Sequence, residues 1–126
     1  MGRRLTGLFG ALAMAAPQAQ AAMEDDLTKT FAYCAGRLSA EVEHAWLMGD
    51  ADADRLEDRR DETLVLLAAV TEEVDSGPVL DLRIRAKQAH ARLLLDASFH
   101  TDPEIAGRAR RLAATRIRAC ASMLLG

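Results

Sequence analysis

Residues 25–48 read DDLTKTFAYCAGRLSAEVEHAWLM, and the apolar side chains in this stretch recur at steps of three and four residues. Because an α-helix turns once in about 3.6 residues, this spacing places them on one face. The stripe consists of Leu27, Phe31, Cys34, Leu38, Val42 and Ala45. Asp25 and Asp26 suit the positive end of a helix dipole, and Gly49 is a natural C-terminal stop. We therefore expect a long amphipathic helix over 25–48.

Two segments after this helix show a similar periodicity. Residues 52–74 predict a second helix, whose stripe is Leu56, Thr63, Leu67, Val70 and Val74. The sequence Ser76-Gly77-Pro78 predicts its end, because glycine accepts a left-handed turn and proline cannot continue the hydrogen-bond ladder. Residues 79–99 predict a third helix with less regular apolar positions, namely Leu80, Ile84, Ala91, Leu94, Leu95 and Ser98.

The fourth predicted helix begins at Thr101-Asp102-Pro103-Glu104, which combines a capping side chain, a first-turn proline and an acid. Its stripe is Ile105, Ala109, Leu112, Ile117, Cys120 and Leu124. The composition is rich in alanine and poor in β-branched residues, so no segment resembles a strand. Four helices joined by short turns predict an all-α fold, a small up-down-up-down four-helix bundle.

Residues 1–21 predict a cleaved signal peptide. Two arginines precede an uncharged apolar run over 5–16 and a small-residue step at 19–21. That run of about a dozen residues is shorter than the ~20 that a membrane anchor needs, which disfavours the alternative of an anchor. We expect a helical domain over 22–126 in a periplasmic or secreted protein without a transmembrane anchor. The paired arginines leave both general and twin-arginine export open.

The predicted mature chain contains two cysteines, Cys34 and Cys120, each on an apolar stripe. In an oxidising compartment such a pair most simply forms one structural disulfide. The bridge would contribute on the order of 4 kcal/mol to stability on the chain-entropy model. A redox-active pair is the alternative, although the C-x-x-C spacing is absent. The two cysteines lie at the same level if the first and last helices are antiparallel, so the disulfide and the bundle support each other.

Charge divides the predicted mature chain into an acidic first half and a basic second half. Residues 22–77 carry a formal charge of −10, and residues 78–126 carry +5. One interpretation is that the two helical hairpins attract each other. The other is a patch of Arg108, Arg111 and Arg118, with Arg83 and Lys87 beside it, that binds an anionic partner. Nucleic acid is not expected, because the chain is acidic overall and is predicted to be exported.

Motifs for chemistry are weak throughout the chain. Asp50, Asp52 and Asp54 have the opening spacing of a calcium loop, but Arg55 stands where that loop needs glycine, which favours helix capping. His44, His90 and His100 contain no pair at the spacing that would place two ligands on one helix face. There is no haem attachment motif and no evident nucleophile with a histidine partner. We expect no cofactor, no metal site and no enzymatic activity.

A second stripe lies beside the apolar face of the first predicted helix. It consists of Tyr33, Gly36, Arg37, Ala40, Glu41 and His44, and it ends near Trp46. Glycine inside a helix costs about 1 kcal/mol relative to alanine, so Gly36 indicates close approach of another helix. One interpretation is that Gly36 admits the disulfide-linked helix while Tyr33 and Trp46 cover the ends of the core. The other is a docking surface in which Tyr33, Arg37, Glu41, His44 and Trp46 contact a partner.

These observations predict a non-catalytic binding or accessory protein for an envelope protein or an anionic envelope component. A carrier of a small anionic ligand is the first alternative, and a cavity lined by Arg83 or Arg116 would favour it. A periplasmic chaperone active under acid or other stress is the second. The sequence predicts neither the partner nor the oligomeric state.

Overall fold

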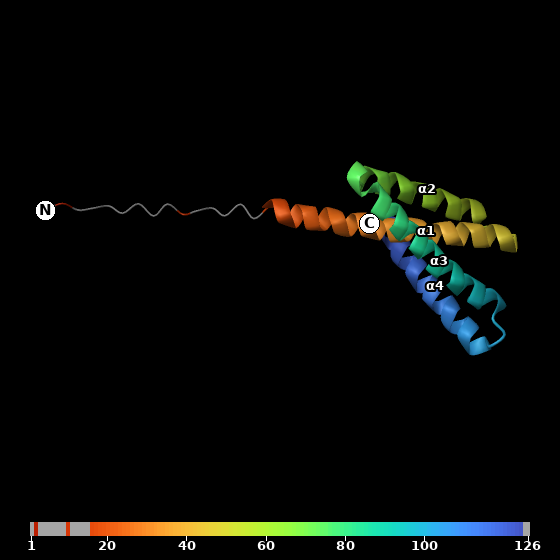
Figure 1. Cartoon of the computed structure of the whole chain (residues 1–126). Helices are drawn as coiled ribbons and strands as arrows, with labels where there is room; N and C mark the ends of the chain where they lie inside the picture. The colour runs from red at the N-terminus through yellow and green to blue at the C-terminus, as the bar shows by residue number, and fades with distance from the viewer. Residues whose placement is uncertain (1, 3–9, 11–15, 125–126) are drawn as a thin grey trace.

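The computed structural model describes residues 2, 10 and 16–124. Within them the chain forms four α-helices and one short 3-10 helix, with no strand (Figure 1). The elements are α1 (Ala16–Met48), α2 (Ala53–Val70), η1 (Glu73–Asp75), α3 (Ser76–Phe99) and α4 (Pro103–Leu124). The predicted all-α class is confirmed. The predicted signal peptide lies mostly outside the described residues, and its cleavage stays a prediction.

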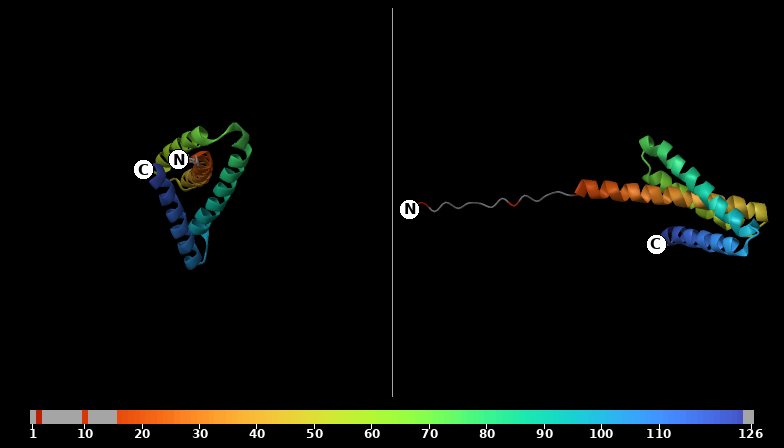
Figure 2. Two further views of the ribbon diagram at one scale, coloured as in Figure 1. Left: turned by 90° about the vertical axis from the view of Figure 1, so that its left-hand side faces the viewer. Right: turned by 60° about the horizontal axis from the view of Figure 1, so that its bottom comes forward.

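The helices run in alternating directions, and α1 is the central one. Viewed along α1, the other three helices lie on three sides of it (Figure 2, left). α1 packs most extensively against α3 and then against α2, whereas α4 packs mainly on α3 and meets α1 over a short stretch. α2 and α3 splay apart from the end at which η1 connects them (Figure 1). The predicted up-down-up-down four-helix bundle stays a prediction.

A disulfide between Cys34 and Cys120 joins α1 to α4, as the sequence predicts. The Cα atoms are 5.5 Å apart, and both residues are buried. The bridge spans 86 residues of sequence, so it ties the first helix directly to the last.

Small side chains dominate the buried contacts, which form two clusters along α1. The first contains Ala32, Ala35, Leu67 and Val79, from α1, α2 and α3. The second contains Ala40, Leu94 and Ala113, from α1, α3 and α4. Because α1 supplies residues to both clusters, it holds α2 at one side and the α3–α4 hairpin at another.

The boundaries of α1 and α4 follow local signals. Gly49 ends α1 with a φ of +64°, which glycine adopts without steric cost. At the start of α4, the carboxylate of Asp102 accepts a hydrogen bond from the backbone N–H of Glu104 at 2.9 Å. The other end of α1 differs from the prediction, because the helix begins at Ala16 and not near Asp25.

The boundary between α2 and α3 also differs from the prediction. α2 ends at Val70, and Thr71 is extended with its hydroxyl donating to the Leu67 carbonyl. Val74 therefore does not belong to the α2 stripe and is 84% exposed. Ser76-Gly77-Pro78 opens α3 and does not end α2, because proline is tolerated in the first turn of a helix.

The predicted packing face of α3 is wrong in four of its six positions, because Leu80, Ile84, Leu95 and Ser98 are exposed. Leu80, Ile84 and Leu95 are about half exposed, whereas the buried residues of α3 are Val79, Ala86, His90 and Leu94. The face that packs on α1 is thus rotated away from Leu80, Ile84 and Leu95. The predicted α4 stripe is more accurate, although Leu112 is 42% exposed.

None of the helices in the described part of the chain combines the length and the apolar composition of a membrane span.

Candidate functional site

The structure separates the second stripe of α1 into residues with different surroundings. Tyr33 and Arg37 contact each other, with the Arg37 guanidinium carbon 5.7 Å from the centre of the Tyr33 ring. Such a cation–π contact contributes about 0.5–1 kcal/mol at an exposed site. Trp46 is 54% exposed, and its position two residues after His44 directs it to another side of the helix. The predicted docking stripe is therefore not one continuous surface.

Glu41 faces α3 and bonds to a buried histidine. Its carboxylate lies 2.7 Å from Nε2 of His90, which has no exposed surface. The other ring nitrogen, Nδ1, has no hydrogen-bond partner in the described structure. Sequence reasoning missed this pair, although His90 continues the three- and four-residue spacing of Val79, Ala86 and Leu94.

His44 connects the C-terminal ends of α1 and α3. Its Nε2 lies 2.9 Å from the hydroxyl oxygen of Ser98, and its ring meets that of Phe99 edge-on at 6.5 Å. Glu41 and His44 thus contact α3, and this part of the predicted docking stripe is a helix contact.

Gly36 marks the closest approach between helices. An added Cβ would lie 2.3 Å from the Arg83 carbonyl oxygen and 2.9 Å from the Ala86 Cβ. The helix that Gly36 admits is therefore α3, and the prediction that it admits the disulfide-linked helix α4 is wrong. The absent side chain allows α3 to cross α1 almost backbone to backbone.

Arginines on α4 are the second group of predicted site residues. Arg108, Arg111 and Arg118 are all exposed. Arg118 donates to the Thr115 hydroxyl at 3.2 Å, and Arg110 donates to the Ala97 carbonyl at 2.9 Å. Among the described residues, no arginine of α4 has a carboxylate oxygen within 4.0 Å.

The cations outside α4 include several that are paired with acids. Lys29 pairs with Asp25, Arg85 with Asp81, and Lys87 with Glu43 across α1 and α3. Lys87 and Arg83 line a hollow beside Gly36 and Ser39, whereas Arg108 and Arg111 line a different groove. Lys87 and Arg83 therefore do not extend the α4 patch.

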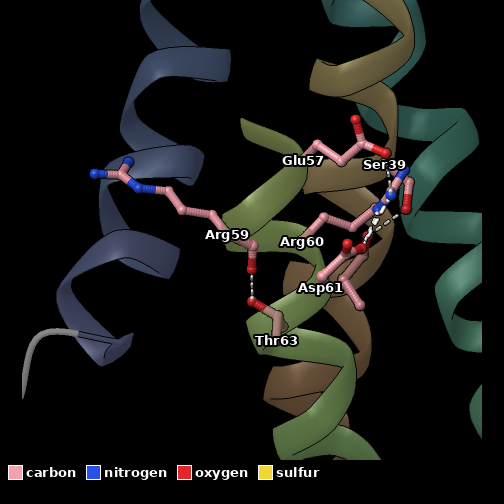
Figure 3. A network of polar contacts seen from close by, with 7 residues as sticks. Ser39, Glu57, Arg59, Arg60, Asp61 and Thr63 are labelled. Carbon is pink, nitrogen blue, oxygen red and sulfur yellow. Dashed lines mark hydrogen bonds and ion pairs between the residues drawn. The ribbon is translucent and has the colours of Figure 1, made fainter. Parts of the chain in front are cut away.

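Figure 3 shows how α2 distributes its two adjacent arginines. Arg60 pairs with Glu57 at 3.1 Å and with Asp61 at 2.9 Å. The side chain of Arg59 points the other way, toward α4 (Figure 3). Although α2 belongs to the acidic half of the chain, it directs Arg59 toward α4. This part of α2 therefore supplies no carboxylate partner to the arginines of α4.

A groove between α3 and α4 contains part of the arginine patch. Its volume is about 600 Å³, and its lining includes Leu93, Ile105, Arg108, Ala109, Arg111 and Leu112. Asp96 is the acid in this lining. An adjoining hollow of about 550 Å³ is lined by Pro103, Glu104, Gly107, Arg108 and Arg111. Arg108 and Arg111 therefore line both hollows.

The acidic turn before α2 is used for local structure. The Asp50 carboxylate accepts a hydrogen bond from the backbone N–H of Asp52 at 2.9 Å, and Asp52 pairs with Arg55 at 2.8 Å. The hydrogen bond and the charge of Arg55 lower the pKa of Asp52. Among the described residues, no group of three or more His, Cys, Asp or Glu is placed so that it could hold a metal ion.

Comparison of the chain with protein-family models, curated proteins and solved structures finds no match. The function must therefore be inferred from the surfaces described above.

Proposed function

We propose that this protein is a non-catalytic binding protein of the cell envelope, and that it docks an acidic segment of a partner protein in the groove between α3 and α4. The observation that carries the proposal is that the arginines of α4 have no carboxylate partner among the described residues. Arg108 and Arg111 stand beside an apolar groove, so charge and apolar surface occur together.

The chemistry of these residues favours carboxylates as ligands. A guanidinium donates two parallel hydrogen bonds to a carboxylate, and such charge-assisted bonds are about twice as strong as neutral ones. Leu112, 42% exposed in the free protein, would lose that exposure beneath a partner. Arginine together with buried apolar anchors is typical of the residues that dominate binding energy.

The groove between two adjacent helices suits a third helix. An amphipathic helix can place its apolar face over Leu93, Ile105 and Leu112 while its acidic residues reach Arg108 and Arg111. We therefore propose an acidic amphipathic helix as the partner segment. Complementary charge would also speed association, and that effect weakens as salt rises.

A direct binding experiment tests this proposal. A glutamate-rich amphipathic peptide should bind the full chain, and its lysine counterpart should not, as measured by fluorescence anisotropy. The double variant Arg108→Glu/Arg111→Glu should abolish binding, whereas Arg92→Glu, at an exposed arginine of α3, should keep it. Equal binding of both peptides, or equal loss in the control, would count against the groove.

The location of this function rests on the predicted signal peptide and on the disulfide. Disulfides persist mainly in oxidising compartments, and Cys34–Cys120 is of the structural kind, buried between two helices. We propose that the mature protein begins at Ala22 and acts in the periplasm or outside the cell. Intact-mass measurement of protein from its native host should give the mass of residues 22–126 with one disulfide. An uncleaved chain with two free thiols would exclude the proposed location.

A further inference from the structure

Arg37 on α1 and Arg116 on α4 lie next to the disulfide. Arg37 follows Cys34 by three residues, and Arg116 precedes Cys120 by four. Because α1 and α4 run in opposite directions (Figure 1), both arginines lie on the same side of the bridge, about one helical turn away. The 5.5 Å separation of the cysteine Cα atoms holds the two helices together at this level.

The charge of Arg116 acts on the Arg37 guanidinium. The pKa of Arg37 is lowered, first by its partial burial and then by the positive charge of Arg116. Both side chains are partly exposed, so a solute can reach them while part of their hydration is already lost. The Tyr33 ring lies against the Arg37 guanidinium, with 5.7 Å between the ring centre and the guanidinium carbon. This contact limits the orientations of the guanidinium.

No carboxylate neutralises this pair within the described structure. Glu41 is four residues after Arg37, the spacing at which a helical ion pair normally forms. Its carboxylate instead bonds to His90 on α3. On α4, the positions three and four residues from Arg116 are Leu112, Ala113, Ala119 and Cys120, none of which is acidic.

We propose that Arg37 and Arg116 form an anion site that takes a single phosphate group, with Tyr33 at its edge. Two cations held together without an acid repel each other, and an anion between them removes that repulsion. A phosphate group carries up to two charges and offers several oxygens, so it can accept hydrogen bonds from both guanidinium forks. A carboxylate, with one charge, matches the pair less well.

Binding of inorganic phosphate to the oxidised full chain tests the site. Calorimetric titration against phosphate, at an ionic strength fixed with sodium chloride, should show saturable binding with one site per chain. Arg37→Gln and Arg116→Gln should each weaken it about tenfold or more, since each removes charge-assisted hydrogen bonds. Arg92→Gln is the matched control and should bind as the unaltered protein does. No binding above the chloride background, or equal loss in Arg92→Gln, overturns the proposal.

Folding of the variants is checked separately. Because Arg116→Gln removes a like charge beside Arg37, it should melt no lower than the unaltered protein in chloride alone. Arg37→Gln removes a like charge too but also loses the cation–π contact with Tyr33, so its melting temperature should change little. Phosphate should raise the melting temperature of the unaltered protein and leave that of the two variants unchanged. Arg37→Lys keeps the charge but loses the planar fork, so it too should bind phosphate more weakly. Unchanged affinity in Arg37→Lys and Arg37→Gln would overturn the role of Arg37.

The phosphate group can belong to a small solute or to a lipid. Glycerol phosphate and vesicles that contain phosphatidic acid present the same phosphomonoester, so comparing them identifies the source. Binding to either supports the site, and binding to neither overturns it. The double variant Arg108→Glu/Arg111→Glu should bind phosphate as before, so the failure of the α3–α4 groove proposal and the failure of this one are distinguishable.

Discussion

The carboxylate of Glu41 lies 2.7 Å from Nε2 of His90, and Arg37, one turn earlier on the same helix, has no ion pair within the described part of the chain. His90 has no exposed surface, and its Nδ1 has no partner in the described structure. Glu41 therefore satisfies one of the two nitrogens of this buried ring, and it does so across the α1–α3 contact. Because the Glu41 carboxylate is held by this bond, it does not form an ion pair with Arg37.

We predict that Glu41→Ala destabilises the protein by about 1–3 kcal/mol, because it leaves a buried donor or acceptor of His90 unsatisfied. Chemical denaturation monitored by circular dichroism measures this loss. Glu43→Ala, two residues further along α1, is the control. It removes the more exposed pair with Lys87, which should cost at most about 1 kcal/mol. A smaller loss for Glu41→Ala than for Glu43→Ala would contradict the importance of the buried bond.

Gly36→Ala is predicted to destabilise the α1–α3 contact. Alanine favours a helix over glycine by about 1 kcal/mol, but its Cβ would meet the Arg83 carbonyl oxygen at 2.3 Å. Overpacking of this kind costs about 1–3 kcal/mol, so we expect a net loss of stability and a lower melting temperature.

Gly107→Ala is the matched control for that substitution. A Cβ at Gly107 meets Nη1 of Arg111 at 3.4 Å, an ordinary contact with a flexible side chain. This variant should gain up to about 1 kcal/mol from helix propensity alone. If both alanine variants gain stability, the two helix backbones do not approach as closely as described.

Local sequence signals predict several features of the fold well. Gly49 ends α1, the Asp102–Pro103–Glu104 signal starts α4, and Cys34 pairs with Cys120. The two helix boundaries depend on neighbouring residues, and the disulfide prediction depends on the presence of two cysteines on apolar stripes, so each can be read from a single sequence. The predicted helix end at Ser76-Gly77-Pro78 is wrong, because the same residues can end one helix or begin the next.

The face of α3 could not be read from apolar spacing. Leu80, Ile84 and Leu95 are apolar, yet they stay half exposed while the smaller Ala86 and the polar His90 are buried. The reason is tertiary: α3 crosses α1 at Gly36, where a small residue such as Ala86 fits the available space. Hydrophobic periodicity contains no information on how closely two backbones approach.

The candidate sites show the same limit. The arginine patch of α4 was predicted because its residues lie close together in the sequence, along one helix. The Glu41–His90 bond and the juxtaposition of Arg37 with Arg116 join residues 49 and 79 positions apart, and they depend on helix crossings. The sequence contained one signal for this juxtaposition. The predicted disulfide, combined with antiparallel first and last helices, places Arg116 at the same level as Arg37.

The Asp52–Arg55 pair predicts a pH dependence with a definite sign. Arg55 lowers the pKa of Asp52 from its ordinary value of 3.8, so the interaction stabilises the fold above that value and is lost as pH falls through the lowered pKa. Arg55→Gln should return the pKa of Asp52 toward 3.8, as followed by carboxyl chemical shifts in a pH titration. An identical titration midpoint in the variant would show that the pair does not form in solution.

The disulfide should stabilise the fold and also organise the Arg37–Arg116 pair. Replacing both cysteines with alanine should lower stability on the order of 4 kcal/mol, because the unfolded chain gains the freedom of a loop that spans 86 residues. Denaturant titration of the double variant and of the oxidised protein gives this difference.

The same variant separates the two proposed binding surfaces. α4 packs mainly on α3 and meets α1 over a short stretch, so without the bridge α4 keeps its groove with α3 but loses its fixed position beside α1. Phosphate affinity should therefore fall, while binding of an acidic helix between α3 and α4 should persist under conditions where circular dichroism shows a folded chain. Retained phosphate affinity in the folded double variant would mean that helix packing alone positions Arg116, and that the covalent bridge contributes stability only.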